Sequence, residues 1–271
     1  ELDDSNSNFA VGLVSSMASG VRAQFGTMAK PLHAGMAAAN GVEAALLAQA
    51  GLVSNPDALE AEHGFADTHM VQNLNTNIAL NHLSKYWMFE EVLHKYHACC
   101  HGLHAAIEAL IKVREQNNLK AENIKNISIA VAPRYLKICN IMAPKTGLEA
   151  KFSFRLSAAM VLARRDTAVL STFSDEACDN EELIALRDQV SVLPDPKLSE
   201  TEAFVQVQTS DDKILNANFD INQPQPFKIK KEKLMHKASA LLGENTACQI
   251  WDVISLGDPE KFKTLTQFKL N

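Results

Sequence analysis

The sequence predicts an α+β fold in which a mostly helical, discontinuous domain carries an inserted, smaller α+β domain. Two observations predict this fold. Alanine-rich and apolar segments with helical spacing fill the beginning of the chain and return after Pro224 and Pro226, whereas strand-like alternation occurs only in the middle. We therefore expect a helical domain at residues 1–91 and 222–271 and an α+β domain at residues 92–221.

The expected helical domain begins with small and apolar residues. Residues 1–8 are polar and are expected to be frayed, and the apolar run at residues 9–20 ends at a glycine, as a buried helix often does. Residues 34–49 are rich in alanine, the best helix former. Asn-Pro-Asp at residues 55–57 is typical of the start of a short helix. Residues 75–91 are mixed in character and helical at best.

The middle of the chain changes in pattern. Apolar residues between 103 and 111 fall on one helical stripe, and residues 127–131 alternate as a strand does. Residues 149–164 are again helical. Two strand-like runs around the turn sequence TSDDK predict a hairpin at residues 205–219, and the tail at residues 230–269 predicts two or three further helices.

Composition and charge exclude several classes of protein. The chain has 271 residues, 46% of them hydrophobic, and a formal net charge of −6, which argues against a nucleic-acid partner. Five cysteines, of which Cys99 and Cys100 are adjacent, indicate a reducing compartment. No apolar run has the length of a membrane span and no signal peptide is visible, so we expect a cytoplasmic protein. Because Glu1 is not an initiator methionine, the chain is expected to begin inside a longer gene product.

The first candidate site is the motif Lys30-Pro31-Leu32-His33. A proline suits the first turn of a helix, so Lys30 and His33 are expected at a helix N-terminus, where unpaired backbone N–H groups and the positive end of the helix dipole favour an anion. Together these groups could bind a carboxylate. The alternative is structural: His33 packs and Lys30 is solvated.

The second candidate site is the segment at residues 94–104, which holds four histidines and two cysteines. Its spacing is not that of a zinc ribbon or finger, so we predict no metal, although a metalloprotein built on this segment is a rival hypothesis. We expect Cys100 and His104 at the start of a helix, with Glu108 holding the His104 imidazole in one tautomer for proton transfer. The alternative is a histidine that only caps the helix. Tyr135, just after the predicted strand, is a third and weaker candidate.

Three stretches of the chain resemble the MmgE/PrpD family, which includes 2-methylcitrate dehydratase and cis-aconitate decarboxylase. They are GTMAKPLHAGMAAANGVEAALLAQAGLVSNPDALEAEHGF, KYHACCHGLHAAIEA and LEAKFSFRLSAAMVLA. The resemblance starts at about Val11 and corresponds to the C-terminal three-fifths of a family member. It implies a helical domain and a smaller α+β lid domain with the active site in the cleft between them, a homodimer, and no metal or organic cofactor.

The resemblance also implies roles for individual residues. Lys30 matches the active-site lysine that would neutralise a substrate carboxylate, and His33 lies in the same motif. His104 is shared by many members, and Tyr135 falls at or one position from a tyrosine of the lid domain. Cys100 stands where decarboxylase-like members have a catalytic histidine, which weakens a decarboxylase assignment.

Family members act on small polycarboxylates by moving a proton at a carbon flanked by carboxylates. His101 or His104 would substitute for the histidine that Cys100 replaces, with His101 among the substrate-binding residues. The family's N-terminal portion, which supplies an Asp, a Thr and further histidines, is missing before Phe9, so this chain is expected to hold only part of a site. The resemblance predicts a dehydratase of a 2-methylcitrate-like acid, as in propionate metabolism. Alternatives are an epimerase or decarboxylase on the same scaffold, or a truncated, non-catalytic remnant.

Overall fold

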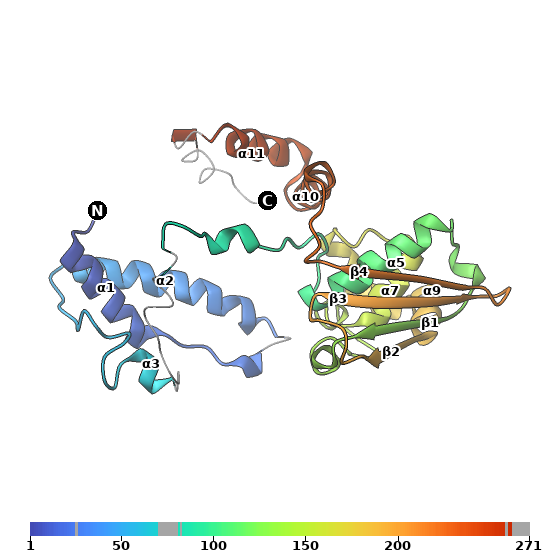
Figure 1. Ribbon diagram of the computed structural model, residues 1–271, viewed down its shortest axis with the longest axis horizontal. Helices are drawn as coiled ribbons and strands as arrows, with labels where there is room; N and C mark the ends of the chain where they lie inside the picture. Colours follow the sequence, from blue (N-terminus) through green and yellow to red (C-terminus); the bar gives the residue numbers. More distant parts are fainter. Residues whose placement is uncertain (25–26, 70–80, 82, 258–259, 262–271) are drawn as a thin grey trace. The chain divides into compact units, whose positions relative to one another are not determined.

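Figure 1 shows a computed structural model of the chain. The residues that it describes are 1–24, 27–69, 81, 83–257 and 260–261. Their contacts divide the chain into two compact units, Glu1–Val92 and Leu93–Asn271. Helices and one four-stranded sheet confirm the α+β class. In the described part of the chain, every helix is too short or too polar to cross a lipid bilayer.

The first unit contains the helices α1 (Asp4–Met17), α2 (Ala29–Gln49) and α3 (Phe65–Thr68). The expectation of a frayed start is wrong, because the carboxylate of Asp3 accepts a hydrogen bond of 2.7 Å from the N–H of Asn6 and caps α1. Residues 55–57 form a turn and not a helix.

The helices α1 and α2 of the first unit pack against each other. Gly12 lies so close to the following loop that an added Cβ would be 2.3 Å from the carbonyl oxygen of Asn55, which explains a glycine inside α1. The α2 helix begins five residues before the expected residue 34, at Ala29, because proline is tolerated in a first turn. Lys30 therefore lies in the first turn of α2 and His33 directly follows that turn, so both are near the helix N-terminus, as predicted.

The second unit is built on a sheet with the strand order β2-β1-β3-β4. β1 pairs in parallel with β2 and antiparallel with β3, and β3 and β4 form the hairpin. The predicted strand at residues 127–131 and the predicted hairpin are confirmed, whereas β2 was not predicted. The bounds are β1 Ile124–Val131, β2 Val190–Pro194, β3 Glu202–Thr209 and β4 Ile214–Asp220.

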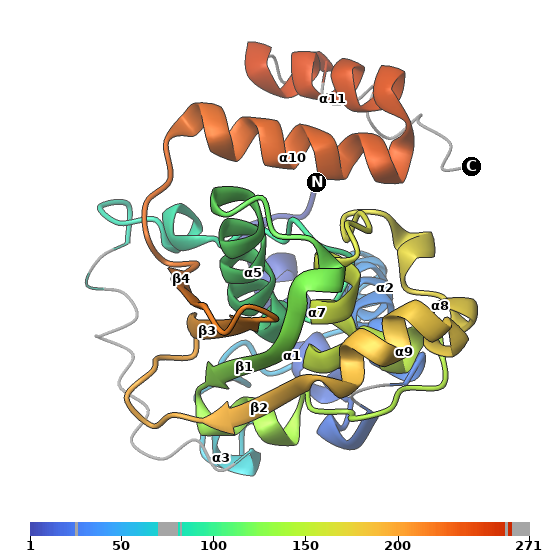
Figure 2. The same cartoon turned by 90° about the vertical axis from the view of Figure 1, so that its right-hand side faces the viewer.

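Helices of the second unit cover one face of this sheet. α5 packs on β3 and β4, and α7 packs on α5, α9 and β2 (Figure 2). Side chains from α5, β1 and α7 form the core, and each large apolar side chain buried there stabilises the fold by about 1.5–3 kcal/mol. The largest fully buried ones include Leu103, Ile107, Leu110, Ile127, Ile129, Phe154 and Leu156. The helix bounds are α5 His104–Gln116, α6 Gly147–Ala150, α7 Phe154–Leu162, α8 Asp175–Asp179 and α9 Glu181–Asp188.

One predicted helix is two helices in the structure. The expected helix at residues 149–164 divides into α6 and α7, because Ser153 between them accepts a hydrogen bond of 3.2 Å from the N–H of Leu156 and caps α7. The predicted apolar stripe of α5 is confirmed, with Leu103, Ile107 and Leu110 buried in the core.

The tail forms α10 (Phe227–Leu242) and α11 (Glu244–Leu256), in agreement with the predicted tail helices up to that point. Residues 258–259 and 262–269 of the predicted tail, and residues 75–80 and 82 of the segment at residues 75–91, lie outside the described residues. The described part of the latter segment includes a 3₁₀ helix at Met88–Glu91. By their contacts, residues 222–257 belong to the second unit and not to the unit that contains residues 1–91. A helical domain shared by these two segments, with residues 92–221 as its lid, stays a prediction.

Candidate active site

The histidine- and cysteine-rich segment lies at the N-terminus of α5. A 3₁₀ turn at His101–Leu103 leads directly into α5, which starts at His104. Backbone hydrogen bonds hold the segment to other loops of the second unit: the N–H of Ala98 donates to Thr167 at 2.7 Å, and that of Cys100 donates to Lys151 at 2.9 Å. The segment is therefore positioned by the fold of the second unit.

Three imidazole rings meet in this segment. The ring centroid of His104 lies 4.9 Å from that of His97 and 5.5 Å from that of His101. His104 is only 1% exposed, and neither of its ring nitrogens has a hydrogen-bond partner among the described residues. Burial, followed by repulsion from His97 and His101, lowers the pKa of His104 from 6.5 to about 2. The central ring is therefore neutral.

The protonated form of His101, the outer ring of this group, is also disfavoured. Burial, and then the nearby charge of Lys95, lowers the pKa of His101. His101 is nevertheless partly exposed. Of His101 and His104, only His101 is therefore accessible to a ligand in solution.

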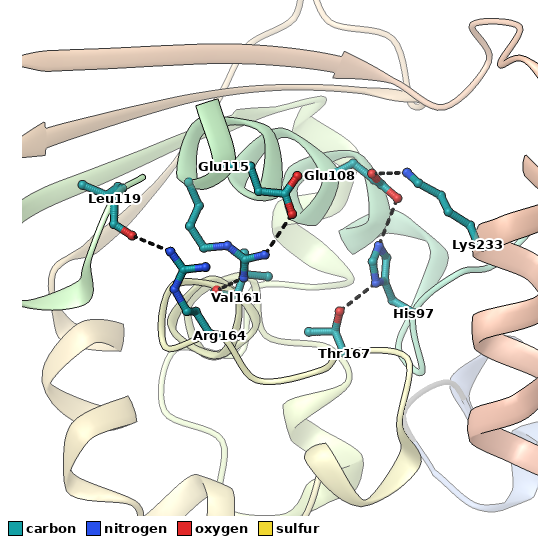
Figure 3. Close-up of polar contacts among 9 residues, drawn as sticks. His97, Glu108, Glu115, Leu119, Val161, Arg164, Thr167 and Lys233 are labelled. Carbon is teal, nitrogen blue, oxygen red and sulfur yellow. Dashed lines mark hydrogen bonds and ion pairs between the residues drawn. The ribbon is translucent and has the colours of Figure 1, made fainter. Parts of the chain in front are cut away.

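The prediction that Glu108 holds the imidazole of His104 is wrong. Oε1 of Glu108 lies 3.4 Å from Nε2 of His97, and its Oε2 lies 2.5 Å from Nζ of Lys233 on α10 (Figure 3). Residues four apart share a helix face, but the His97 ring packs beside His104 and meets this carboxylate instead. Nδ1 of His97 is 2.7 Å from Oγ1 of Thr167. The acid therefore orients His97.

Glu108 is a buried carboxylate held in its ionised form. Burial raises its pKa, but the contacts with His97 and Lys233 and the charge of Lys233 outweigh that effect, so the pKa lies below its ordinary value. The positive charge of α10 thus compensates a negative charge inside the second unit. Buried ion pairs of this kind are costly to break because one partner is left uncompensated.

A phenol and two thiols lie beside the imidazoles. Tyr135 sits in a 3₁₀ helix, Pro133–Lys137, that follows β1. A Cβ added to Gly102 would be 2.4 Å from Cε1 of Tyr135 and 3.2 Å from Sγ of Cys139, so only glycine lets the tyrosine ring approach the backbone there. Burial raises the pKa of Tyr135, followed by the charge of Glu200.

The thiol of Cys139 is linked to the half-buried Cys100. A hydrogen bond with Cys100, and then burial, raises the pKa of Cys139 well above its ordinary value. This thiol and the phenol of Tyr135 are therefore protonated and can act as hydrogen-bond donors. The structure thus brings four predicted residues, Cys100, His101, His104 and Tyr135, to the N-terminal end of α5.

The two other predicted residues belong to the first unit. Lys30 is exposed in the first turn of α2. His33 is half-buried and packs on the backbone of Gly20, whose φ of +110° is one that glycine tolerates. His33 also lines a pocket of about 300 Å³ together with Met36 and Asn40. The carboxylate-binding roles of Lys30 and His33 stay predictions.

Other residues of the site were missed by sequence reasoning. His97 had been noted only as one member of the histidine group, and nothing had pointed to Thr167 or Lys233. Lys233 is 125 residues away from Glu108 in the chain, so no local spacing relates them. Among the residues that the structure describes, no group of three or more His, Cys, Asp or Glu side chains is arranged to hold a metal ion.

Comparison with known proteins gives matches to both parts of the chain. Residues 97–249 match the MmgE/PrpD C-terminal domain, and residues 1–76 match the MmgE/PrpD N-terminal domain. The chain is similar to cis-aconitate decarboxylase from Homo sapiens, with 29% identity over 160 residues, which cover 56% of this chain and 32% of that protein. The chain thus spans only about a third of the length of this curated relative. Since the C-terminal match alone covers more than half of the chain, the protein belongs to the MmgE/PrpD family.

Proposed function

We propose that this protein is a lyase that acts on a small polycarboxylate, and that its reaction is the dehydration of a 2-methylcitrate-like acid. Membership of the MmgE/PrpD family supports the class of enzyme. The observation that carries the proposal is the group of imidazoles at the start of α5, in which the central ring of His104 is neutral, beside a protonated phenol. Dehydration needs such a pair, one group to accept a proton and another to donate one.

The reaction moves two protons in opposite directions. A base removes a proton from the carbon next to a carboxylate, and the electron pair of that C–H bond forms the C=C bond as the C–O bond to the hydroxyl breaks. The hydroxyl takes a proton from an acid and leaves as water. We assign the base to the pair of His101 and His104, and the acid to Tyr135.

The low pKa of His104 makes the empty site a weak base. A bound polycarboxylate changes this, because its negative charges stabilise an imidazolium and oppose the effect of burial. The site therefore gains basicity when the substrate is present. Glu108 and Thr167 act as positioning residues, since they fix the orientation of His97 against the central ring.

Carboxylate binding is assigned to cations and neutral donors. Lys30 supplies a positive charge and His33 a neighbouring donor, and their place near the N-terminus of α2 adds backbone N–H groups. His101 and the thiol of Cys100 are the proposed donors to the substrate at the start of α5. Homodimeric assembly and a cytoplasmic location stay predictions, of which the first is checked by light scattering.

The test is turnover of 2-methylcitrate by the full chain, followed through the absorbance of the new C=C bond. We expect His104→Gln to lower the rate by about 10²–10⁴-fold, the usual contribution of a general acid–base residue. Lys30→Ala is expected to lower it by a similar factor. The matched control is His69→Gln, which replaces an exposed histidine of the first unit and leaves the rate unchanged.

Two results would contradict the proposal. Full activity in His104→Gln would remove the assigned base. Absence of both turnover and calorimetric binding of 2-methylcitrate in the wild type would favour a non-catalytic remnant.

Decarboxylation is a second candidate, which the similarity to cis-aconitate decarboxylase favours. In that reaction a C–C bond breaks, CO₂ leaves without the electron pair, and the remaining carbanion takes a proton from a donor such as Tyr135. Release of CO₂ from cis-aconitate, without formation of a new C=C bond from 2-methylcitrate, would replace dehydration by this reaction.

A further inference from the structure

A separate cavity of the second unit is lined in part by His97. It has a volume of about 630 Å³ and opens between the C-terminal half of α5, the loop after α7 and α10. A volume of this size fits a small ligand. His97 lines the cavity, but none of Cys100, His101, His104 and Tyr135 does. The cavity is therefore separate from the proposed catalytic residues.

The lining of this cavity carries an excess of positive charge. Five of its side chains are Lys or Arg and three are carboxylates, on a chain whose formal net charge is −6. All three carboxylates already have partners. Glu108 pairs with Lys233, and Asp166 lies 2.9 Å from His236. Glu115 lies 3.3 Å from Nη2 of Arg114. Within the described ranges, no carboxylate forms an ion pair with Lys112 or Arg164. The cavity therefore attracts anions.

Two guanidinium groups are fixed at the wall of the cavity. Nη1 of Arg114 donates to the carbonyl of Val161 at 2.6 Å, and Nη2 of Arg164 donates to the carbonyl of Leu119 at 3.4 Å (Figure 3). The carbonyl of Val161 belongs to the last turn of α7, so Arg114 also caps that helix, whereas Leu119 lies three residues beyond the end of α5. Nη2 of Arg114 also donates to Oε1 of Glu115 at 3.3 Å, whereas the side chain of Arg164 makes only the bond to Leu119 among the described residues. Several of the five N–H donors of each guanidinium therefore remain for other acceptors.

One of these donors is buried without an acceptor. The side chain of Arg114 is only 14% exposed, and its Nε has no hydrogen-bond partner among the described residues. Helix capping does not explain this atom, because the cap uses Nη1. A buried donor of a charged group is costly unless an acceptor reaches it. An oxyanion supplies such an acceptor, since the guanidinium fork matches two oxygens of a carboxylate or phosphate.

We propose that this cavity is a second ligand site, which binds a small oxyanion with two or more negative charges through Arg114, Arg164 and Lys233. The shared chemistry is that of phosphate and of di- or tricarboxylates. The site does not depend on the proposed lyase activity. It is nevertheless connected to the histidines, because Lys233 also holds Glu108, which in turn contacts His97.

The test is isothermal titration calorimetry of the full chain with inorganic phosphate and, separately, with citrate, at constant ionic strength. We expect saturable binding of at least one of them. Arg164→Gln is expected to weaken it by about tenfold or more, because a charge-assisted bidentate contact is lost. Arg164→Lys keeps the positive charge but not the planar guanidinium, so its affinity is expected to lie between those of the wild type and Arg164→Gln. Saturation by phosphate alone identifies a phosphate site, and saturation by citrate alone identifies a carboxylate site.

Controls separate this site from the catalytic proposal and from general charge effects. Lys125→Gln removes an exposed lysine that does not line the cavity, so binding remains at the wild-type level. His104→Gln combined with Lys30→Ala abolishes the proposed activity and leaves binding in the cavity intact. If Arg164→Gln does not fold, Lys112→Gln tests the same cavity from an exposed position. Absence of saturable binding in the millimolar range, or equal affinity in wild type and cavity variants, would overturn the proposal.

Discussion

The two units of this protein differ in how much they bury. In the first unit the buried hydrophobic residues among those described are only Ala44 and Ala48, while large side chains such as Leu46 stay exposed. The second unit buries a sheet face, α5 and α7 in one continuous core. Side chains are therefore fixed more firmly in the second unit, where Cys100, His101, His104 and Tyr135 lie. The relative positions of these four side chains are therefore determined by the core of the second unit alone.

The largest expected effect tests this contrast in burial. Phe154→Ala, in the core of the second unit, is expected to lower the free energy of unfolding by about 3–5 kcal/mol, because it removes a buried ring and leaves a cavity. Leu46→Ala, in the first unit, is expected to change it by about 0.5 kcal/mol or less, since that side chain is 59% exposed. Urea unfolding followed by circular dichroism measures both. Equal losses would break the comparison.

The next effect concerns the buried charge. Glu108→Gln is expected to cost about 3 kcal/mol of unfolding free energy, because Lys233 loses the carboxylate that compensates its charge. Glu115→Gln is the matched control on the same helix, and its exposed carboxylate is expected to contribute about 0.5 kcal/mol or less. Chemical unfolding at neutral pH distinguishes the two variants. A Glu108→Gln variant as stable as Glu115→Gln would show that the pair does not anchor α10.

A smaller effect is expected where the backbone meets Tyr135. Gly102→Ala is expected to cost about 2 kcal/mol, because the new methyl group overlaps the tyrosine ring. Gly35→Ala, in α2, meets no atom within 4 Å and is expected to be neutral or slightly stabilising. Thermal unfolding compares them. Recovery of stability in Gly102→Ala combined with Tyr135→Leu would confirm that the contact is with the ring.

The smallest effect, taken per unit of pH, is a dependence on pH. The pKa of His104 falls from 6.5 to about 2 on folding, so the unfolded state binds its proton more readily. The stability that the neutral ring contributes is complete above pH 6.5 and is lost as pH falls towards 2, at about 1.4 kcal/mol per pH unit. Urea unfolding at several pH values should therefore show a weaker acid dependence in His104→Asn than in the wild type. Parallel curves would contradict the buried state of this ring.

Much of the fold follows from local patterns in the sequence. The apolar stripe of α5, the strand β1 and the hairpin of β3 and β4 were predicted because apolar residues recur there with the spacing of a helix or a strand. β2 was not predicted, because its five residues are too few to show a clear pattern and the strand is stabilised by its parallel pairing with the distant β1. The same limit applies to the site: the histidine group was visible, but the pairing of Glu108 with Lys233 depends on a contact between distant segments.

The most direct test of the proposed function is the titration of His104 by NMR of ¹³C- or ¹⁵N-labelled histidine, with and without citrate as a stand-in for the substrate. We expect the His104 signals to stay those of a neutral imidazole from pH 8 to pH 5 in the free protein. Citrate should shift them towards the protonated form, because bound negative charge favours an imidazolium. A ring that titrates near pH 6.5 and does not respond to citrate would contradict both its burial and its proposed role.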